Sequence, residues 1–194
     1  MSKKIVFIQG SPRKKGNTRA MAALAMAAAR ENGAKVAELD AVGLGFKEAG
    51  CLACQKCQES ELYQCVLGDE VAEKVAGLPE YDTLVLATPI YWWSYPAQLK
   101  ILIDRMYCLS KFSDPAGYRS ALAGKTLAIL ATGGGGLEDN LSLLESQWRQ
   151  PALMLGTKFL SCLFPDVSPE PGSLLKDPTA VEKAKDFGRL LAGS

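Results

Sequence analysis

Short apolar runs alternate along this chain with longer stretches that have the residue spacing of amphipathic helices. The apolar runs are nearly continuous, which is typical of parallel strands that are covered on both faces. We predict strands at 4–9, 35–39, 83–87, 126–131 and 158–163, and helices at 18–32, 69–77, 97–109, 138–150 and 179–191. This order predicts an α/β fold: a single doubly wound, five-stranded parallel sheet with right-handed crossovers.

Three segments interrupt the regular alternation. Residues 42–64 form a long connection that holds Cys51, Cys54 and Cys57 and is followed directly by Cys65. Residues 111–124 contain Pro115 and Gly117, and residues 164–178 contain four prolines. We expect an irregular lobe at 111–124 and an extended surface arm at 164–178, because proline disfavours helices and central strands. The 194 residues fit one domain, 1–194, with a cysteine-rich insert at about 42–65.

Composition narrows the function. Histidine is absent, which excludes imidazole bases, Ser-His or Cys-His pairs and histidine metal ligands. The net charge of +1 gives no electrostatic argument for nucleic acid, and no apolar run has the length of a membrane span. The start of the chain lacks the apolar segment of a signal peptide. We therefore expect a cytoplasmic protein whose six cysteines are reduced or bind a metal.

The run from Gly10 to Thr18 directly follows the first predicted strand and opens the first predicted helix. A helix start offers free N–H groups and a partial positive charge, so this loop predicts a phosphate site. The candidate donors and close-approach positions are Ser11, Arg13, Gly16, Asn17 and Thr18. The glycine spacing matches neither the dinucleotide-binding nor the Walker motif. A plain surface turn that caps the helix is the alternative.

Two more loops follow predicted strands. Residues 89–95 carry Tyr91, Trp92, Trp93 and Tyr95, and suit a planar heterocycle because stacking needs flat faces. Residues 132–136 contain four consecutive glycines, whose amides could lie against a ligand. Alternatively, the tryptophans could serve core packing or an oligomer interface, and the glycines could form a flexible loop tip. Ligands bind at the carboxyl ends of parallel strands, so three such loops together favour a common site.

Three stretches resemble the flavodoxin-like NAD(P)H-dependent FMN reductases: the Gly-Ser-Pro-Arg and Gly-Asn-Thr of the first loop, residues 87–105, and residues 124–136. The resemblance covers about residues 4–165. It implies the strand order 2-1-3-4-5 and bound FMN, with chemistry at the flavin N5 and no catalytic side chain. It also implies that Ser11, Arg13, Asn17 and Thr18 hold the phosphate. The ring would be lined by Pro89, Ile90, Tyr91, Trp92, Thr132, Gly133 and Gly134.

A cysteine cluster completes the candidate chemistry. Cys51, Cys54 and Cys57 stand at two-residue intervals, and Cys65 follows seven residues after Cys57. The pattern resembles the cysteine runs that bind iron–sulfur clusters and points to the iron–sulfur flavoprotein branch of the family. A [4Fe-4S] cluster, a structural zinc ion and metal-free redox thiols all remain open. Cys108 and Cys162 are expected to be small buried apolar residues.

We therefore expect an oxidoreductase in which a reduced nicotinamide, NADH or NADPH, delivers hydride to FMN. The electrons would pass to an iron–sulfur cluster, a protein or a small acceptor such as flavin or quinone. A flavodoxin-type electron carrier and a zinc-stabilised, non-catalytic protein are the alternatives. Exposed aromatic residues favour a homodimer or homotetramer. Asp104 and Arg105 are expected to belong to a network at a helix end rather than to the chemistry.

Overall fold

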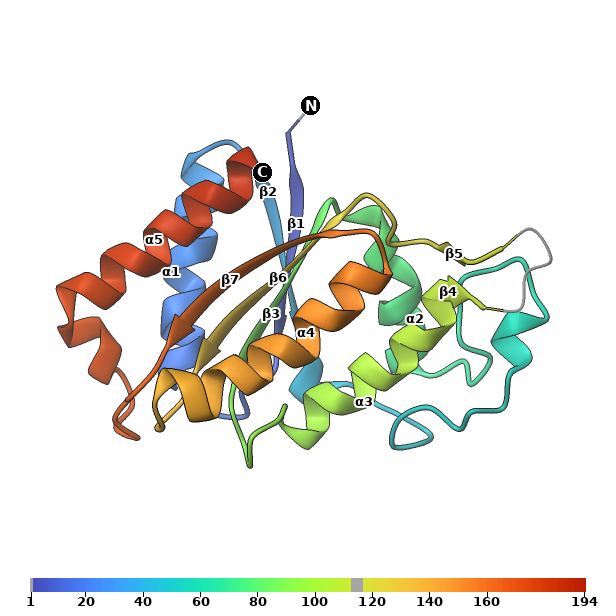
Figure 1. The fold of residues 1–194 in the computed structure, drawn as a ribbon, viewed down its shortest axis with the longest axis horizontal. Helices are drawn as coiled ribbons and strands as arrows, with labels where there is room; N and C mark the ends of the chain where they lie inside the picture. The colour runs from blue at the N-terminus through green and yellow to red at the C-terminus, as the bar shows by residue number, and fades with distance from the viewer. Residues whose placement is uncertain (1, 113–116) are drawn as a thin grey trace.

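The computed structural model describes residues 2–112 and 117–194. Its main feature is a five-stranded sheet in the order β2-β1-β3-β6-β7, in which every neighbouring pair is parallel (Figure 1). The strands are β1 (Lys4–Gln9), β2 (Lys35–Asp40), β3 (Thr83–Pro89), β6 (Thr126–Thr132) and β7 (Lys158–Phe164). Counted among the large strands, this is the order 2-1-3-4-5, so the predicted fold class is confirmed.

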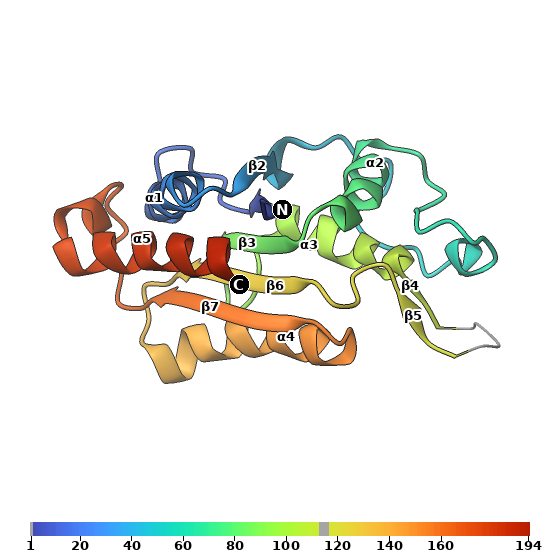
Figure 2. The same ribbon diagram turned by 90° about the horizontal axis from the view of Figure 1, so that it is seen from above.

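Helices cover both faces of the sheet (Figure 2). They are α1 (Asn17–Glu31), α2 (Glu70–Gly77), α3 (Ala97–Arg105), α4 (Ser142–Met154) and α5 (Pro178–Gly193). One apolar core lies between the sheet and α1 and α5, and the other between the sheet and α2, α3 and α4. The three central strands are buried along nearly their whole length, which explains their continuous apolar sequences.

The predicted strands end within one or two residues of the observed ones, but two helices differ from the prediction. The helix predicted at 97–109 ends at Arg105 and continues as a tighter 3-10 turn, Met106–Leu109. The helix predicted at 138–150 begins as a π-helical turn, Leu137–Leu141, and α4 then runs to Met154. Pro151 lies inside α4, where it removes one backbone donor near the helix end without stopping the helix.

The irregular segments hold short elements. The segment 111–124 contributes to a small hairpin of β4 (Ser110–Lys111) and β5 (Arg119–Ser120), and Pro115 lies outside the described residues. The hairpin lies beside the cysteine-rich segment, beyond α2 and α3 (Figures 1 and 2). The arm contains one 3-10 turn, Ser173–Lys176. It returns from the end of β7 to the start of α1, as described below.

The contact between α1 and α5 generates a prediction about stability. A Cβ atom at Gly188 would lie 2.1 Å from the backbone oxygen of Ala25. Gly188→Ala should therefore force the helices apart and lower the free energy of unfolding by about 1–3 kcal/mol, as overpacking does. Gly193→Ala, also in α5, is the control because its Cβ would meet nothing within 4 Å. Urea denaturation compares the two, and equal stabilities would contradict the close packing.

Candidate functional site

A cavity of about 500 Å³ opens at the carboxyl edge of the sheet. The three loops singled out in the sequence meet there, together with part of the arm. The cavity is lined by Ser11, Arg13, Gly16, Asn17, Thr18, Pro89, Ile90, Tyr91, Thr132, Gly133, Gly134, Val167, Ser168 and Pro169. Every predicted cofactor-binding residue except Trp92 is in this set. The sequence analysis missed Val167, Ser168 and Pro169, although they too follow a strand, β7, at the same edge.

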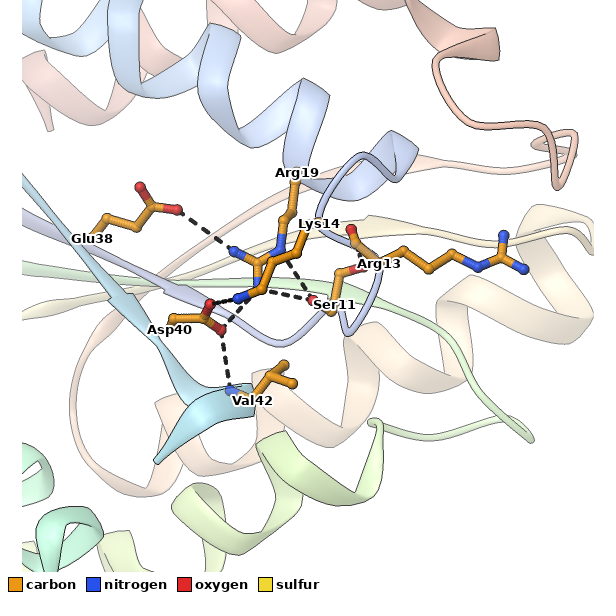
Figure 3. A network of polar contacts seen from close by, with 7 residues as sticks. All are labelled: Ser11, Arg13, Lys14, Arg19, Glu38, Asp40 and Val42. Carbon is orange, nitrogen blue, oxygen red and sulfur yellow. Dashed lines mark hydrogen bonds and ion pairs between the residues drawn. The ribbon is translucent and has the colours of Figure 1, made fainter. Parts of the chain in front are cut away.

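A network of charged side chains holds the first loop from α1 and β2 (Figure 3). Arg19 of α1 donates two hydrogen bonds to the carbonyl oxygen of Ser11, at 3.0 Å from Nε and 2.9 Å from Nη2. The same Nη2 lies 2.8 Å from Oδ1 of Asp40, whose other oxygen pairs with Lys14. Arg13 points away from this network. The loop is thus fixed by residues that do not line the cavity.

The network also acts on the protonation of Asp40. Partial burial by itself would raise the pKa of this carboxyl group. Hydrogen bonds from Arg19, Lys14 and the backbone N–H of Val42 outweigh that effect and hold the pKa below its usual value. Asp40 is therefore a carboxylate at neutral pH, and its charge orients Arg19 toward Ser11.

Asn17 fastens the arm across the first loop. The Asn17 amide nitrogen donates to the carbonyl oxygens of Ser168 and Glu170, at 3.1 and 3.0 Å, and to Ser173 Oγ at 2.9 Å. Its Oδ1 accepts the backbone N–H of Leu174 at 3.3 Å. The side chain that the sequence assigns to a phosphate is thus engaged with the arm. What Asn17 offers the cavity is its backbone N–H at the start of α1.

Arg13, unlike Asn17, uses only one of its side-chain donors within the protein. One of its guanidinium nitrogens, Nη1, donates to the carbonyl oxygen of Pro169 at 3.0 Å, and the side chain is exposed. A guanidinium carries five N–H donors, so this single bond leaves most of the group available to an anion. The carbonyl oxygen of Pro169 therefore places the charge of Arg13 at the cavity.

The third loop is joined to α1 and to β7. Thr18 and Thr132 share a buried hydrogen bond between their hydroxyl oxygens, 2.7 Å apart. The Gly133 N–H donates to Phe164 O at 3.0 Å, so this amide is already used within the protein. A Cβ at Gly133 would lie 2.7 Å from Asn140 Oδ1 and 2.8 Å from Ile90 Cγ2. Glycine is required there by close packing of the loop rather than by a free donor.

The aromatic loop is a tight two-residue turn. Tyr91 and Ser94 exchange backbone hydrogen bonds at 2.9 and 3.0 Å, with Trp92 and Trp93 between them. Both tryptophans have positive φ, 49° and 59°, a conformation that bulky residues rarely adopt. Trp93 donates its indole N–H to Asp139 O at 2.9 Å, whereas Trp92 is 90% exposed and does not line the cavity. The strained backbone of the turn thus presents Trp92 almost completely, and Trp93 by half, to the surroundings beside Tyr91, which lines the cavity.

A second, small cavity gathers the cysteines. Cys51, Cys54, Cys57 and Cys65 all line it, together with Cys108. Ala53 and Gln55, which separate the first three cysteines, have positive φ of 52° and 60°. These left-handed residues wind the backbone so that successive cysteines face the same cavity. Burial raises the pKa of the Cys108 thiol to about 12, with a further contribution from neighbouring Cys65 and Cys57.

Arg105 anchors the cysteine segment to α3. Its Nε lies 3.1 Å from Sγ of Cys65, Nη2 lies 2.7 Å from Oδ1 of Asp69, and Nη1 lies 3.5 Å from the carbonyl oxygen of Gly50. The guanidinium is fully buried. The expected helix-end network around Arg105 is confirmed, and it reaches one of the candidate metal ligands. Asp104 belongs to an ion pair with Lys100 on the surface of α3.

The cysteine segment has the donor chemistry of a thiolate-bound metal centre. Four thiols face one cavity, and a buried cation contacts one of them. Within residues 2–112 and 117–194, however, no three histidine, cysteine, aspartate or glutamate side chains are drawn together as they would be around one ion. The residues fit such a centre in the kind of donor that they supply, and all four line the same cavity.

Comparison with known proteins identifies the family. A family model described as NADPH-dependent FMN reductase matches residues 3–161, which is most of the chain. The chain belongs to this family. The membership makes it an oxidoreductase, as the sequence predicted, and confirms the resemblance on which that prediction rested. Among the described residues, no helix combines the length and apolar character needed to cross a membrane.

Individual relatives point to one branch of the family. An iron–sulfur flavoprotein of Methanosarcina thermophila is 36% identical over 132 residues, which cover 68% of this chain and 63% of the relative. One of Methanocaldococcus jannaschii is 28% identical over 97% of this chain and 95% of the relative. The chain thus spans less than two thirds of the first of these two relatives. The solved structure of an NAD(P)H:quinone oxidoreductase from Methanothermobacter marburgensis superposes on this one with a TM-score of 0.75 at 18% sequence identity. The match covers 98% of this chain and 100% of that chain, and it supports the fold.

The Asp40 network generates a prediction about pH. Since the folded state lowers the pKa of Asp40, its charge stabilises the protein above the unfolded pKa of about 3.9. That contribution is lost as the pH falls through the lower folded value. Asp40→Asn should therefore reduce the free energy of unfolding at pH 7 by up to about 1 kcal/mol, since the group is partly exposed. In urea denaturation the difference from the parent protein should shrink below about pH 4; a difference independent of pH would contradict the network.

Proposed function

We propose that this chain is an FMN-dependent oxidoreductase that takes electrons from NAD(P)H and passes them to an iron–sulfur centre or to a small soluble acceptor. The observation that carries the proposal is the cavity at the carboxyl edge, where three separate loops and the arm meet. Membership of the FMN reductase family supports the cofactor and the donor. Flavin and quinone are the acceptors to test first, and the choice between NADH and NADPH is left to the assay.

The chain would bind FMN with its phosphate at the start of α1. Arg13 supplies charge there, Ser11 its hydroxyl group, and the first turn of α1 its backbone N–H groups. The ring would lie between Pro89–Ile90–Tyr91 and Thr132–Gly133–Gly134, with Trp92 at the rim. Bound FMN supplies the electron-transfer chemistry, so no histidine or other acid–base side chain is needed. The protein's part is to position the two cofactors and to exclude water with its aromatic and apolar walls.

The four cysteines would hold a [4Fe-4S] cluster. The convergence of Cys51, Cys54, Cys57 and Cys65 on one cavity supports this assignment, as do the names of the two archaeal relatives. The buried guanidinium of Arg105 beside Cys65 favours a negatively charged thiolate centre. A zinc ion on four thiolates would have similar charge and is distinguished by metal analysis.

A homodimer or homotetramer is the proposed assembly. Trp92 is almost fully exposed on a strained turn, and aromatic side chains are enriched at interface centres. Light scattering at micromolar concentration measures the mass directly, and a monomer near 20.8 kDa would contradict this part of the proposal.

The phosphate site generates a prediction about affinity. Arg13→Ala removes a charge-assisted donor worth roughly 1.5–3 kcal/mol, so FMN affinity should fall about ten- to a hundred-fold. Arg30→Ala is the control, because Arg30 lies at the far end of α1 and contacts the backbone of β2. Fluorescence titration of flavin into cofactor-free protein measures both. Unchanged affinity in an Arg13→Ala, Asn17→Ala double variant would refute the assignment of the phosphate loop.

Anaerobically purified protein tests the redox function. FMN absorbance that is bleached by NAD(P)H supports the reductase. Flavin that NAD(P)H does not bleach indicates a flavodoxin-type carrier, and a colourless zinc protein indicates a non-catalytic relative.

Cys54→Ser should abolish bound iron and sulfide while FMN stays bound, because the two sites use different loops. Cys162→Ala, in β7 and away from the cysteine cavity, is the control. FMN without iron or sulfide in the parent protein would contradict the cluster.

A further inference from the structure

A buried lysine lies beneath the cysteine segment. Lys111, in β4, is only 4% exposed. Its Nζ donates to the carbonyl oxygens of Cys57 at 2.5 Å, Leu62 at 2.8 Å and Ser60. An ammonium group has three N–H donors, so three carbonyl oxygens satisfy it fully. No carboxylate in the described part of the chain forms an ion pair with it.

All three carbonyl oxygens belong to the spacer, residues 57–65, which runs from the third cysteine to the fourth. The ring of Tyr63, in the same spacer, lies 5.2 Å from the ammonium nitrogen. Gln58 extends the contact, since its amide nitrogen donates to Ser110 O and its Oε1 accepts the N–H of Phe112. The spacer is therefore wrapped around one side chain and paired with the strand that carries it. This accounts for a seven-residue spacing that is long for a cluster motif.

The charges around the cysteine cavity do not balance without the thiols. Arg105 and Lys111 bring two buried positive charges, and the buried carboxylate that offsets them is Asp69. The carbonyl contact of Lys111 is on Cys57 itself, so its charge lies directly behind a candidate ligand. Deprotonated cysteines around a metal carry the missing negative charge, and a nearby cation stabilises the state with one more electron.

We propose that Lys111 is a positioning residue of the cysteine centre: it shapes the 57–65 spacer around its ammonium group, and its charge favours the reduced state of a thiolate-bound cluster. The second half of this inference rests on the proposed iron–sulfur function. The first half concerns the protein alone, because the contacts are made without any metal. The two halves therefore need separate measurements.

Lys111→Met tests the first half in metal-free protein. Without the three hydrogen bonds the spacer should open more often, and Cys57 should react with iodoacetamide about ten- to a hundred-fold faster, followed by peptide mass spectrometry. Lys125→Met is the matched control. Its Nζ also donates to two carbonyl oxygens, of Pro79 and Tyr81, but these belong to the turn before β3 and not to the cysteine segment. Labelling of Cys57 at the parent rate in Lys111→Met would overturn the positioning role.

Anaerobic protein tests the second half. In Lys111→Met the midpoint potential of the cluster should become more negative, whereas Lys111→Arg keeps the charge and should stay near the parent value. Lys111→Arg also serves if the methionine variant does not fold: it should still label faster at Cys57, because a planar guanidinium cannot match three carbonyls arranged for an ammonium. Equal potentials in both variants and the parent would overturn the electrostatic role. Parent protein without iron would refute the cluster, while the labelling result would still decide the positioning.

Discussion

The parallel arrangement of the sheet is the constraint on which the rest of the structure depends. Parallel strands bring every loop that follows a strand to one edge, whatever the distance along the chain. Residues 11–18, 89–91, 132–134 and 167–169 meet there for that reason alone. Because the central strands are buried on both faces, the edge is also the place where polar groups can reach a ligand. The parallel sheet thus determines where the cavity lies, and the residues of the loops determine its chemistry.

The loops are held by side chains that are already engaged within the protein, and two of them, Arg19 and Asp40, do not line the cavity. Arg19 fixes the carbonyl oxygen of Ser11, Asp40 fixes Arg19, and the Asn17 amide fixes the arm. Such supports keep the free donors of α1 in place before a ligand arrives, which lowers the ordering cost of binding. The turn at Trp92 and Trp93 differs from these supports, because its backbone is strained. Two bulky residues at positive φ are tolerated there, and backbone strain of that kind concentrates at functional sites.

The parallel sheet and the three loops of the cavity could be predicted from the sequence. Continuous apolar runs indicate buried parallel strands, and glycine, hydroxyl and aromatic residues indicate the loops. The roles of single side chains could not be predicted. Nothing in the run Gly16-Asn17-Thr18 indicates that the Asn17 amide bonds to residues 168–174, more than 150 positions away. The arm was expected only to be a surface feature, since its prolines predict irregular backbone but not where that backbone lies. Helix ends were displaced at Arg105 and Pro151 because tertiary packing, not local propensity, decides how far a helix continues.

The cysteine centre illustrates why spacing motifs carry only part of the information. The four thiols come from one segment, but the groups that shape it, Arg105 and Lys111, come from α3 and the β4 strand that follow. Two buried cations are costly to keep in a protein unless negative charge is close by. In the described structure Asp69 is paired with Arg105, and three carbonyl oxygens surround the ammonium group of Lys111, so both cations are accommodated beside the cysteines. The pattern of cysteines in the sequence gives their spacing but not these two cations, because Arg105 and Lys111 lie 40 or more residues further along the chain than the cysteines they contact.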